Sequence, residues 1–242
     1  ADGQLRLAEF AWDDGRIATS GSFAGVPLAS AARFAGVALP FRSTLALGGE
    51  WSLAAAPGLT GTLTVRRESG DVSYTPGTSS DATIIAGIMA LEAAARFTDG
   101  AVAATASLRS TRGNAADAKL DIGTVAGAPA GRLSKDAPLD FSLTADLPSL
   151  HFLQPWIGSA AVVSGRAHLD IAARGTVVRA ALTGALKGED LRIDAPQYGL
   201  HFTNGRLVAR AAEGRVVIEE ILLGAGAGTF RASGEIAGLA PG

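Results

Sequence analysis

Polar and apolar residues alternate with a period of two along most of this chain. Between residues 59 and 67, threonines separate Leu59, Leu63 and Val65, and between residues 87 and 97 the even positions carry Glu92 and Arg96. An Asp-Gly turn at residues 99–100 follows, and the alternation resumes over residues 102–109. Strict alternation on both sides of an Asp-Gly pair predicts a β-hairpin with one apolar and one polar face.

The same alternation returns in residues 139–144, 163–171, 178–187, 206–210 and 230–236. Turn-forming dipeptides separate the runs at residues 14–15, 48–49, 69–70, 204–205 and 213–214. The pattern predicts about fifteen strands, most of them joined to the next as antiparallel hairpins. Because the period never changes for good, residues 1–242 are predicted to form one continuous β segment.

Helix-forming pattern is scarce. Residues 24–34 allow a turn or two of helix, limited by Gly25 and Pro27. Residues 147–158 interrupt the alternation, and Pro148 followed by Leu150 and Leu153 predicts a short helical insert that caps one edge or mouth of the sheet. Residues 75–81 and 125–138 are the expected loops, and the second is also the expected place of a hinge if the sheet divides into two halves.

Composition removes several function classes. Only 18% of the residues are charged, against roughly 25% in an ordinary soluble domain. The net charge of −2, without a basic block, argues against a nucleic-acid partner. The absence of cysteine excludes disulfides, thiolate metal sites and cysteine nucleophiles, and three histidines leave little for catalysis. We therefore expect that the protein is not an enzyme. The sequence contains no run of 18 apolar residues, so no membrane-spanning helix is predicted.

The predicted apolar face needs a cover, and three arrangements supply one. A membrane barrel is disfavoured, because three Trp and two Tyr cannot form two aromatic girdles. A sandwich with a dry core remains an alternative. We favour an elongated antiparallel sheet folded lengthwise into a U-shaped β-taco with a continuous apolar groove.

Strand parity selects the residues expected to line this groove, because a one-residue slip would expose the whole apolar set. The parity is weakest at Leu120 and Ile122, which only Lys119 and Asp121 flank. The predicted lining residues are Leu63, Val65, Met89, Leu91, Val102, Leu108, Leu120, Ile122, Phe141, Leu143, Leu169, Ile171, Leu182, Leu186, Phe202, Leu207, Ile218 and Phe230.

The second half of the chain resembles the TamB and AsmA-like family of bacterial envelope bridge proteins. The ordered series that carries the resemblance comprises residues 139–147, a helix-like insert, and residues 164–176, 182–186, 191–200, 204–209 and 228–236. It contains an Asp-Leu block, Gly-opened strands and a closing Gly-x-Phe-x-x-x-Gly-x-Ile run. The first 135 residues have a similar pattern but no equally dense series of motifs.

The resemblance implies a periplasmic β-taco in a larger protein that an N-terminal helix anchors in the inner membrane. Such proteins carry phospholipid, held by its acyl chains, toward the outer membrane. The family is also the partner of TamA, an outer-membrane barrel that assists protein assembly. We therefore expect this chain to be a segment of such a protein, although it lacks the anchor helix.

Candidate catalytic chemistry is weak throughout the sequence. His168 and His201 fall on the polar faces of predicted strands and His151 in the insert, so all three are interpreted as solvated surface residues rather than metal ligands. Adjacent acidic pairs in strands point to opposite faces and cannot converge on a substrate. The Gly-rich residues 224–228 precede a strand rather than a helix, which excludes a dinucleotide site. No catalytic residue, metal or cofactor is predicted.

Two functions remain. The first is a conduit whose apolar interior shields acyl chains. The second is a protein-interaction scaffold that assists outer-membrane protein and autotransporter assembly by pairing client strands with its sheet edges.

Overall fold

The computed structural model describes residues 3–34, 36, 38–39, 41–55, 58–74, 84–125, 134–157, 161–212 and 214–237. The predicted loop at residues 75–81 lies outside the described residues, as do residues 126–133 of the predicted loop at 125–138.

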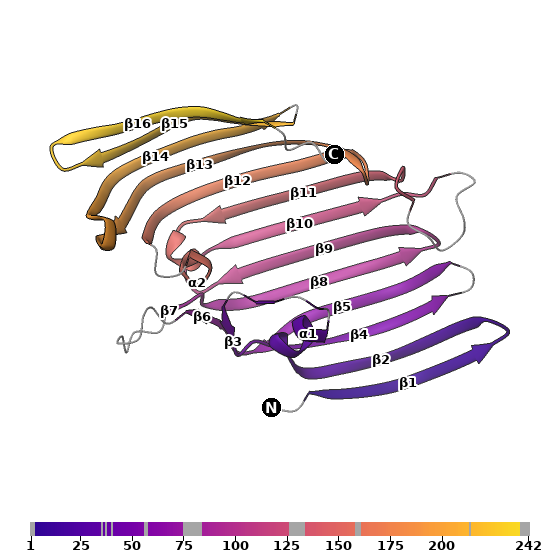
Figure 1. Cartoon of the computed structure of the whole chain (residues 1–242). Helices are drawn as coiled ribbons and strands as arrows, with labels where there is room; N and C mark the ends of the chain where they lie inside the picture. Colours follow the sequence, from indigo (N-terminus) through magenta and orange to yellow (C-terminus); the bar gives the residue numbers. More distant parts are fainter. Residues whose placement is uncertain are drawn as a thin grey trace.

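One long antiparallel sheet dominates the chain, and it does not close into a barrel (Figure 1). The prediction of an all-β antiparallel fold is confirmed, with sixteen strands among the described residues where about fifteen were expected. In spatial order the thirteen strands of the main sheet are β1 (Gln4–Asp13), β2 (Arg16–Pro27), β4 (Ala46–Ala55), β5 (Leu59–Ser69), β8 (Ile88–Thr98), β9 (Ala101–Ser110), β10 (Ala115–Ile122), β11 (Pro138–Leu147), β12 (Val162–Thr176), β13 (Arg179–Ala195), β14 (Leu200–Ala212), β15 (Arg215–Ala225) and β16 (Gly228–Ala237).

The remaining elements are short and lie in the connections between the long strands. A second sheet contains β3 (Arg42–Ser43), β6 (Val72–Tyr74) and β7 (Ile84–Ile85). The helices are α1 (Leu28–Phe34), η1 (Leu150–Leu153), α2 (Gln154–Ile157) and η2 (Pro196–Tyr198). The structure thus has helical turns in both places where the alternation breaks.

The two strands that flank the region predicted as a hinge, β10 and β11, pair with each other. Strands β10 and β11 pair over eight consecutive residues, from Ala115 opposite Asp146 to Ile122 opposite Leu139. The backbone N–H of Gly123 then donates to the carbonyl oxygen of Pro138 at 2.8 Å. The ladder is therefore continuous from the first strand of the sheet to the last.

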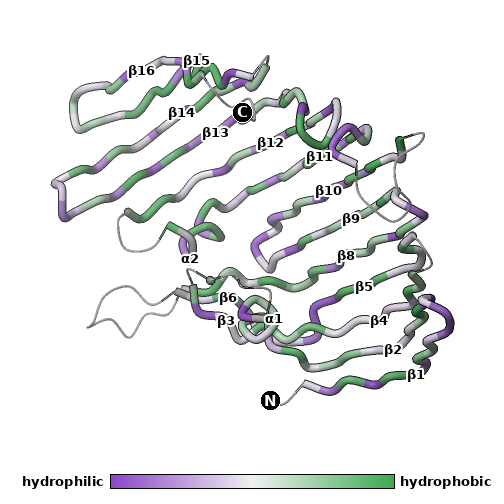
Figure 2. The backbone as a smooth tube through the Cα atoms, turned by 45° about the vertical axis from the view of Figure 1, so that its right-hand side comes forward, coloured by the Kyte–Doolittle hydropathy of each residue, from purple (hydrophilic) through white to green (hydrophobic). Residues whose placement is uncertain are grey.

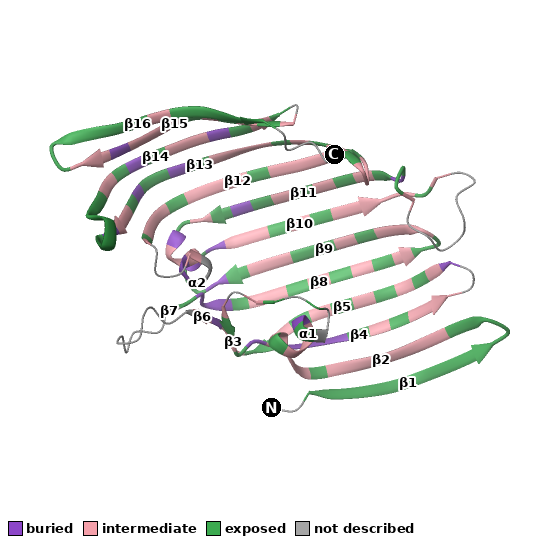
Figure 3. Cartoon of the chain, viewed as in Figure 1, coloured by how far each residue is buried: buried purple, intermediate pink, exposed green. Residues whose placement is uncertain are grey.

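The inserted elements pack against one end of the long strands (Figure 1). Phe152 of η1 packs with Val72, Ala86 and Ile88, and Leu150 of the same helix packs with Leu191 and Leu223. Figure 3 shows that most of the length of the strands is half-buried or exposed. Large fully covered apolar side chains therefore concentrate at the end that carries the inserts.

Glycine is required where two strands approach closely. Gly61 has a φ of +127°, and a Cβ atom there would collide with the carbonyl oxygen of Ser52 on β4. A Cβ atom added to Gly234 on β16 would meet no other atom within 4 Å.

We expect Gly61→Ala to lower the free energy of unfolding by about 1–3 kcal/mol, because alanine tolerates neither this φ nor this contact. Gly234→Ala serves as the control and should change the free energy by less than about 0.5 kcal/mol. Urea denaturation of both variants measures the difference. Equal stability of the two variants would contradict the close approach of β4 and β5.

Candidate apolar binding face

One face of the main sheet is apolar on all thirteen strands. Residues directly opposite each other in an antiparallel ladder lie on the same face, so the register traces this face from strand to strand. One row across the sheet joins Trp51, Leu63, Ala95, Ala104, Leu120, Phe141, Ala173 and Leu182. We call the side that carries this row the apolar face, and the other side the polar face. Figure 2 shows hydrophobic and hydrophilic residues alternating along most strands.

Seventeen of the eighteen predicted lining residues share the apolar face. They are Leu63, Val65, Leu91, Val102, Leu108, Leu120, Ile122, Phe141, Leu143, Leu169, Ile171, Leu182, Leu186, Phe202, Leu207, Ile218 and Phe230. Leu120 and Ile122, where the parity was weakest, are opposite Phe141 and Leu139. The role of these seventeen residues in lining a lipid groove stays a prediction.

The position of Met89 was predicted wrongly. The pairing of β8 with β9 shifts between Ile88 and Ala90, which places Ile88 rather than Met89 on the apolar face. Ile88 is buried in the cluster with Phe152, whereas Met89 is 58% exposed. A bulge adds one residue to a strand and reverses the parity beyond it, and the alternation alone does not reveal this.

Most of the apolar face has no second layer over it. In the described part of the chain, every element outside the main sheet is seven residues long or shorter. The apolar side chains at the two ends of the ladder are the most accessible: Leu5 and Trp12 on β1 are 72% and 71% exposed, and Phe230 and Ile236 on β16 are 47% and 55% exposed. The described residues therefore form no sandwich over this face.

A shallow hollow crosses the apolar face from β5 to β11. Five alanines form its floor, Ala93, Ala95, Ala104, Ala106 and Ala118, and we call them the alanine lane. The larger side chains of Leu63 and Val65 lie at one end, and those of Leu120 and Phe141 at the other. The hollow has a volume of about 200 Å³ and an almost wholly apolar lining.

The lane residues and the aromatic residues of the first strands were missed by the sequence reasoning. Phe23 on β2 and Trp51 on β4 share the apolar face, with ring centroids 6.5 Å apart. Parity within each strand already separates Ala93 and Ala95 from Arg96, and that signal could have found the lane. What parity within a strand does not show is that small residues of three strands lie side by side.

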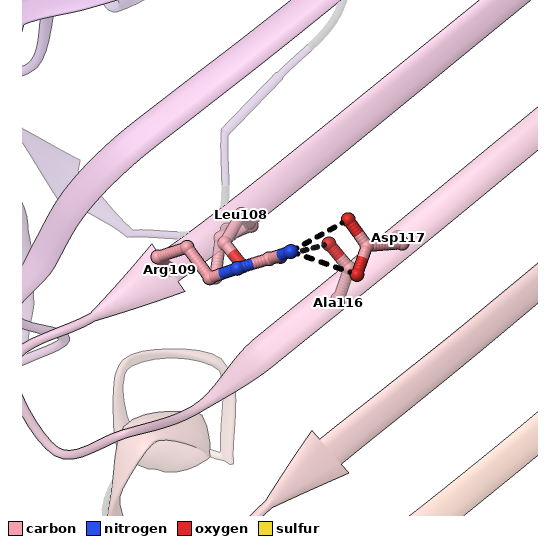
Figure 4. Close-up of polar contacts among 4 residues, drawn as sticks. All are labelled: Leu108, Arg109, Ala116 and Asp117. Atoms are coloured by element: carbon pink, nitrogen blue, oxygen red, sulfur yellow. Dashed lines mark hydrogen bonds and ion pairs between the residues drawn. The ribbon is translucent and has the colours of Figure 1, made fainter.

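The polar face carries cross-strand ion pairs. The Nη2 atom of Arg109 lies 2.9 Å from both carboxylate oxygens of Asp117, and Nη1 donates to the carbonyl oxygens of Leu108 and Ala116. Figure 4 shows these four residues. Arg174 pairs with Asp140 across β11 and β12, and Arg166 pairs with Glu189 across β12 and β13. These pairs are solvent-exposed, so each contributes little to stability, and their main effect is to keep charge on one side of the sheet.

His168 lies on this polar face between two carboxylates. Its Nδ1 atom is 2.6 Å from Asp146 and its Nε2 atom is 2.7 Å from Asp170, which also accepts a hydrogen bond from Thr144. Hydrogen bonds to Asp146 and Asp170 raise the pKa of His168 above its ordinary value of 6.5. The hydrogen bond from His168, followed by that from Thr144, lowers the pKa of Asp170 below 3.8. The imidazole is thus part of an ion-pair network rather than an isolated surface residue.

We expect protonated His168 to stabilise the sheet at acidic pH. Because its pKa is raised on folding, the stabilisation is complete below pH 6.5 and is lost as the pH rises through the folded-state value. The effect should stay below about 1 kcal/mol, since the side chain is partly exposed. Thermal unfolding of the wild type and of His168→Gln between pH 5 and pH 9 tests this. Parallel pH profiles of the two proteins would contradict it.

The described residues contain no cluster of three or more His, Asp and Glu side chains suited to a metal ion. No helix in this part of the chain is both long and apolar enough to cross a membrane. Comparisons with protein-family models, with curated proteins and with solved structures gave no match.

Proposed function

We propose that this chain forms part of a periplasmic hydrophobic conduit that moves phospholipid between the inner and outer membranes. The observation that supports the proposal is the apolar face that continues over thirteen strands with little cover, while the ion pairs lie on the opposite face. In this proposal the sheet curves lengthwise into a β-taco, and the resemblance to the TamB and AsmA-like family supplies the cellular setting. A membrane anchor, a TamA-type partner and a translocation and assembly module belong to the same proposal.

The chemistry of the apolar face suits acyl chains. Each methylene group removed from water contributes about 0.8 kcal/mol, so a chain of many methylenes gains enough to leave an aqueous compartment. From β11 to β13 the rows consist mainly of Ala, Val, Leu, Ile, Phe and Gly, which offer no polar group that would hold a lipid at one point in this part of the sheet. A ladder of similar rows allows a chain to move from strand to strand.

Native mass spectrometry of the purified chain tests this function. We expect phospholipid to co-purify with the wild-type chain and to be absent from a variant in which a charged side chain obstructs the apolar face. Photo-crosslinking residues placed at Leu143 and, as the control, at Ser142 should label lipid from the first position only, because the two side chains lie on opposite faces. Equal labelling from both positions, or none, would contradict the conduit.

A second function has its own supporting observation. Strands β1 and β16 end the ladder, and each pairs with a single neighbour in the described structure. Unpaired edges of this kind accept further strands. An interaction scaffold that assists outer-membrane protein and autotransporter assembly would use these edges and leave the apolar face free, so proline substitutions in β1 would impair it without changing lipid content.

A further inference from the structure

Arg67 is an exception on the apolar face. It follows Leu63 and Val65 at intervals of two residues on β5, and it is opposite Leu47 on β4. Arg67 therefore lies on the same side of the sheet as these apolar residues. Among the described residues whose pairing traces this face, it is the one that carries a charge. It is half-buried, so its charge is not simply solvated.

The contacts of Arg67 hold its guanidinium group without neutralising it. Nε and Nη2 donate to the carbonyl oxygen of Gly70 at 3.1 and 2.9 Å, and Nη1 donates to that of Met89 at 3.0 Å. These bonds use three of the five N–H donors of a guanidinium group. No carboxylate among the described residues forms an ion pair with Arg67, and two donors remain for another acceptor.

The hollow that contains the alanine lane starts at Leu63 and Val65 on the strand of Arg67, and Arg67 itself is not one of its lining residues. Val65, which lines the hollow, is two residues from Arg67 on the same strand and face, about 7 Å away along β5. From β5 to β11 the hollow crosses four interstrand steps of about 4.8 Å, or about 19 Å in total. A single acyl chain spans half of a hydrocarbon core of about 30 Å, so the lane is long enough for one chain.

We propose that Arg67 and the alanine lane form one binding site for an anionic phospholipid. The phosphate would accept hydrogen bonds from the two remaining N–H donors of Arg67, and one acyl chain would lie along the lane toward Phe141. A planar guanidinium group suits two phosphate oxygens at once, and the partial burial strengthens the interaction. This site rests on the proposed function and refines it, because it names a headgroup charge and a fixed position on the apolar face.

The test compares two ligands with the same acyl chains, dioleoyl phosphatidylglycerol and dioleoylglycerol, which compete for the full chain in native mass spectrometry. We expect the wild type to prefer the phosphate-bearing ligand by about tenfold or more, because a charge-assisted hydrogen bond typically increases affinity by at least this factor. Arg67→Gln should reduce this preference to about one. Arg66→Gln is the matched control, because the neighbouring arginine lies on the polar face, and it should keep the wild-type preference.

Filling the lane provides an independent variant that leaves Arg67 in place. Ala106→Leu should weaken both ligands to a similar extent, whereas Ser107→Leu on the opposite face should weaken neither. If Arg67→Gln does not fold, as thermal unfolding would reveal, unchanged binding to Ala106→Leu overturns the site by itself.

The outcomes separate this site from the conduit. Phospholipid binding that is insensitive to Arg67→Gln, or equally sensitive to Arg66→Gln, overturns the site and leaves the conduit standing. Failure of the wild type to bind either ligand overturns both proposals.

Discussion

Leu182→Arg is expected to abolish phospholipid binding while the sheet stays folded. Leu182 lies on the apolar face of β13, opposite Ala173, and it is half-buried rather than enclosed. An arginine there loses the partial burial of the leucine, about 1–2 kcal/mol, but its long side chain can reach water from an uncovered sheet. An acyl chain that passes the same row meets a charge in an apolar environment, which costs about 2.5–3.5 kcal/mol, roughly a hundredfold in occupancy.

Thr183→Arg is the matched control, because the next residue along β13 is exposed on the polar face. Thermal unfolding and phospholipid content by native mass spectrometry are measured for both variants, and complementation of envelope lipid defects by the full-length protein adds a functional readout. A folded Leu182→Arg variant that still binds lipid and complements would contradict the conduit and leave strand pairing at the edges. If this variant unfolds outright while Thr183→Arg does not, the apolar face is a closed, dry core in solution.

Phe152→Ala is expected to cause the largest loss of stability among simple truncations. Phe152 is 7% exposed and packs against Val72 of the small sheet, Ala86, and Ile88 of β8. Leu150 in the same 3₁₀-helix packs against Leu191 and Leu223. This one short helix therefore joins two clusters that lie on different halves of the ladder. Removing a buried phenylalanine ring typically costs about 3–5 kcal/mol, because the cavity that remains collapses only in part.

Phe10→Ala offers a control with the same change of side chain. Phe10 on β1 is 59% exposed, so its truncation should cost less than about 1 kcal/mol. Urea denaturation measures both values. Hydrogen exchange at the amide of Ala86, which donates to the carbonyl oxygen of Val72, should accelerate in Phe152→Ala alone. Similar losses in the two variants would contradict the packing of the insert against the end of the sheet.

The alternation of the sequence determined the class of the fold and the composition of its two faces. Side chains in a strand point alternately to opposite sides, so Leu63 and Val65, or Leu169 and Ile171, share a face wherever the strand is regular. The pairs Asp14-Gly15 and Asp99-Gly100 mark where consecutive strands meet, because their residues adopt positive φ. The predicted turns at residues 48–49 and 204–205 were wrong, since these residues lie inside β4 and β14. The short insert was predictable as well, since residues 147–158 break the alternation. All of these features depend on residues close together in the chain.

Only the tertiary structure decided that β5 pairs with β8 across the small sheet, where the register shifts, and which end of the sheet the inserts cover. The bulge at Met89 is invisible in the sequence, because it arises from the match between β8 and β9 rather than from either strand alone. The alanine lane brings together residues from three strands whose parity was clear but whose alignment was not. Parity within the strand groups Arg67 with Leu63 and Val65, and the structure adds its position opposite Leu47 and its hydrogen bonds to the carbonyl oxygens of Gly70 and Met89. Register is set by contacts between distant segments, and a period of two within one strand carries no information about them.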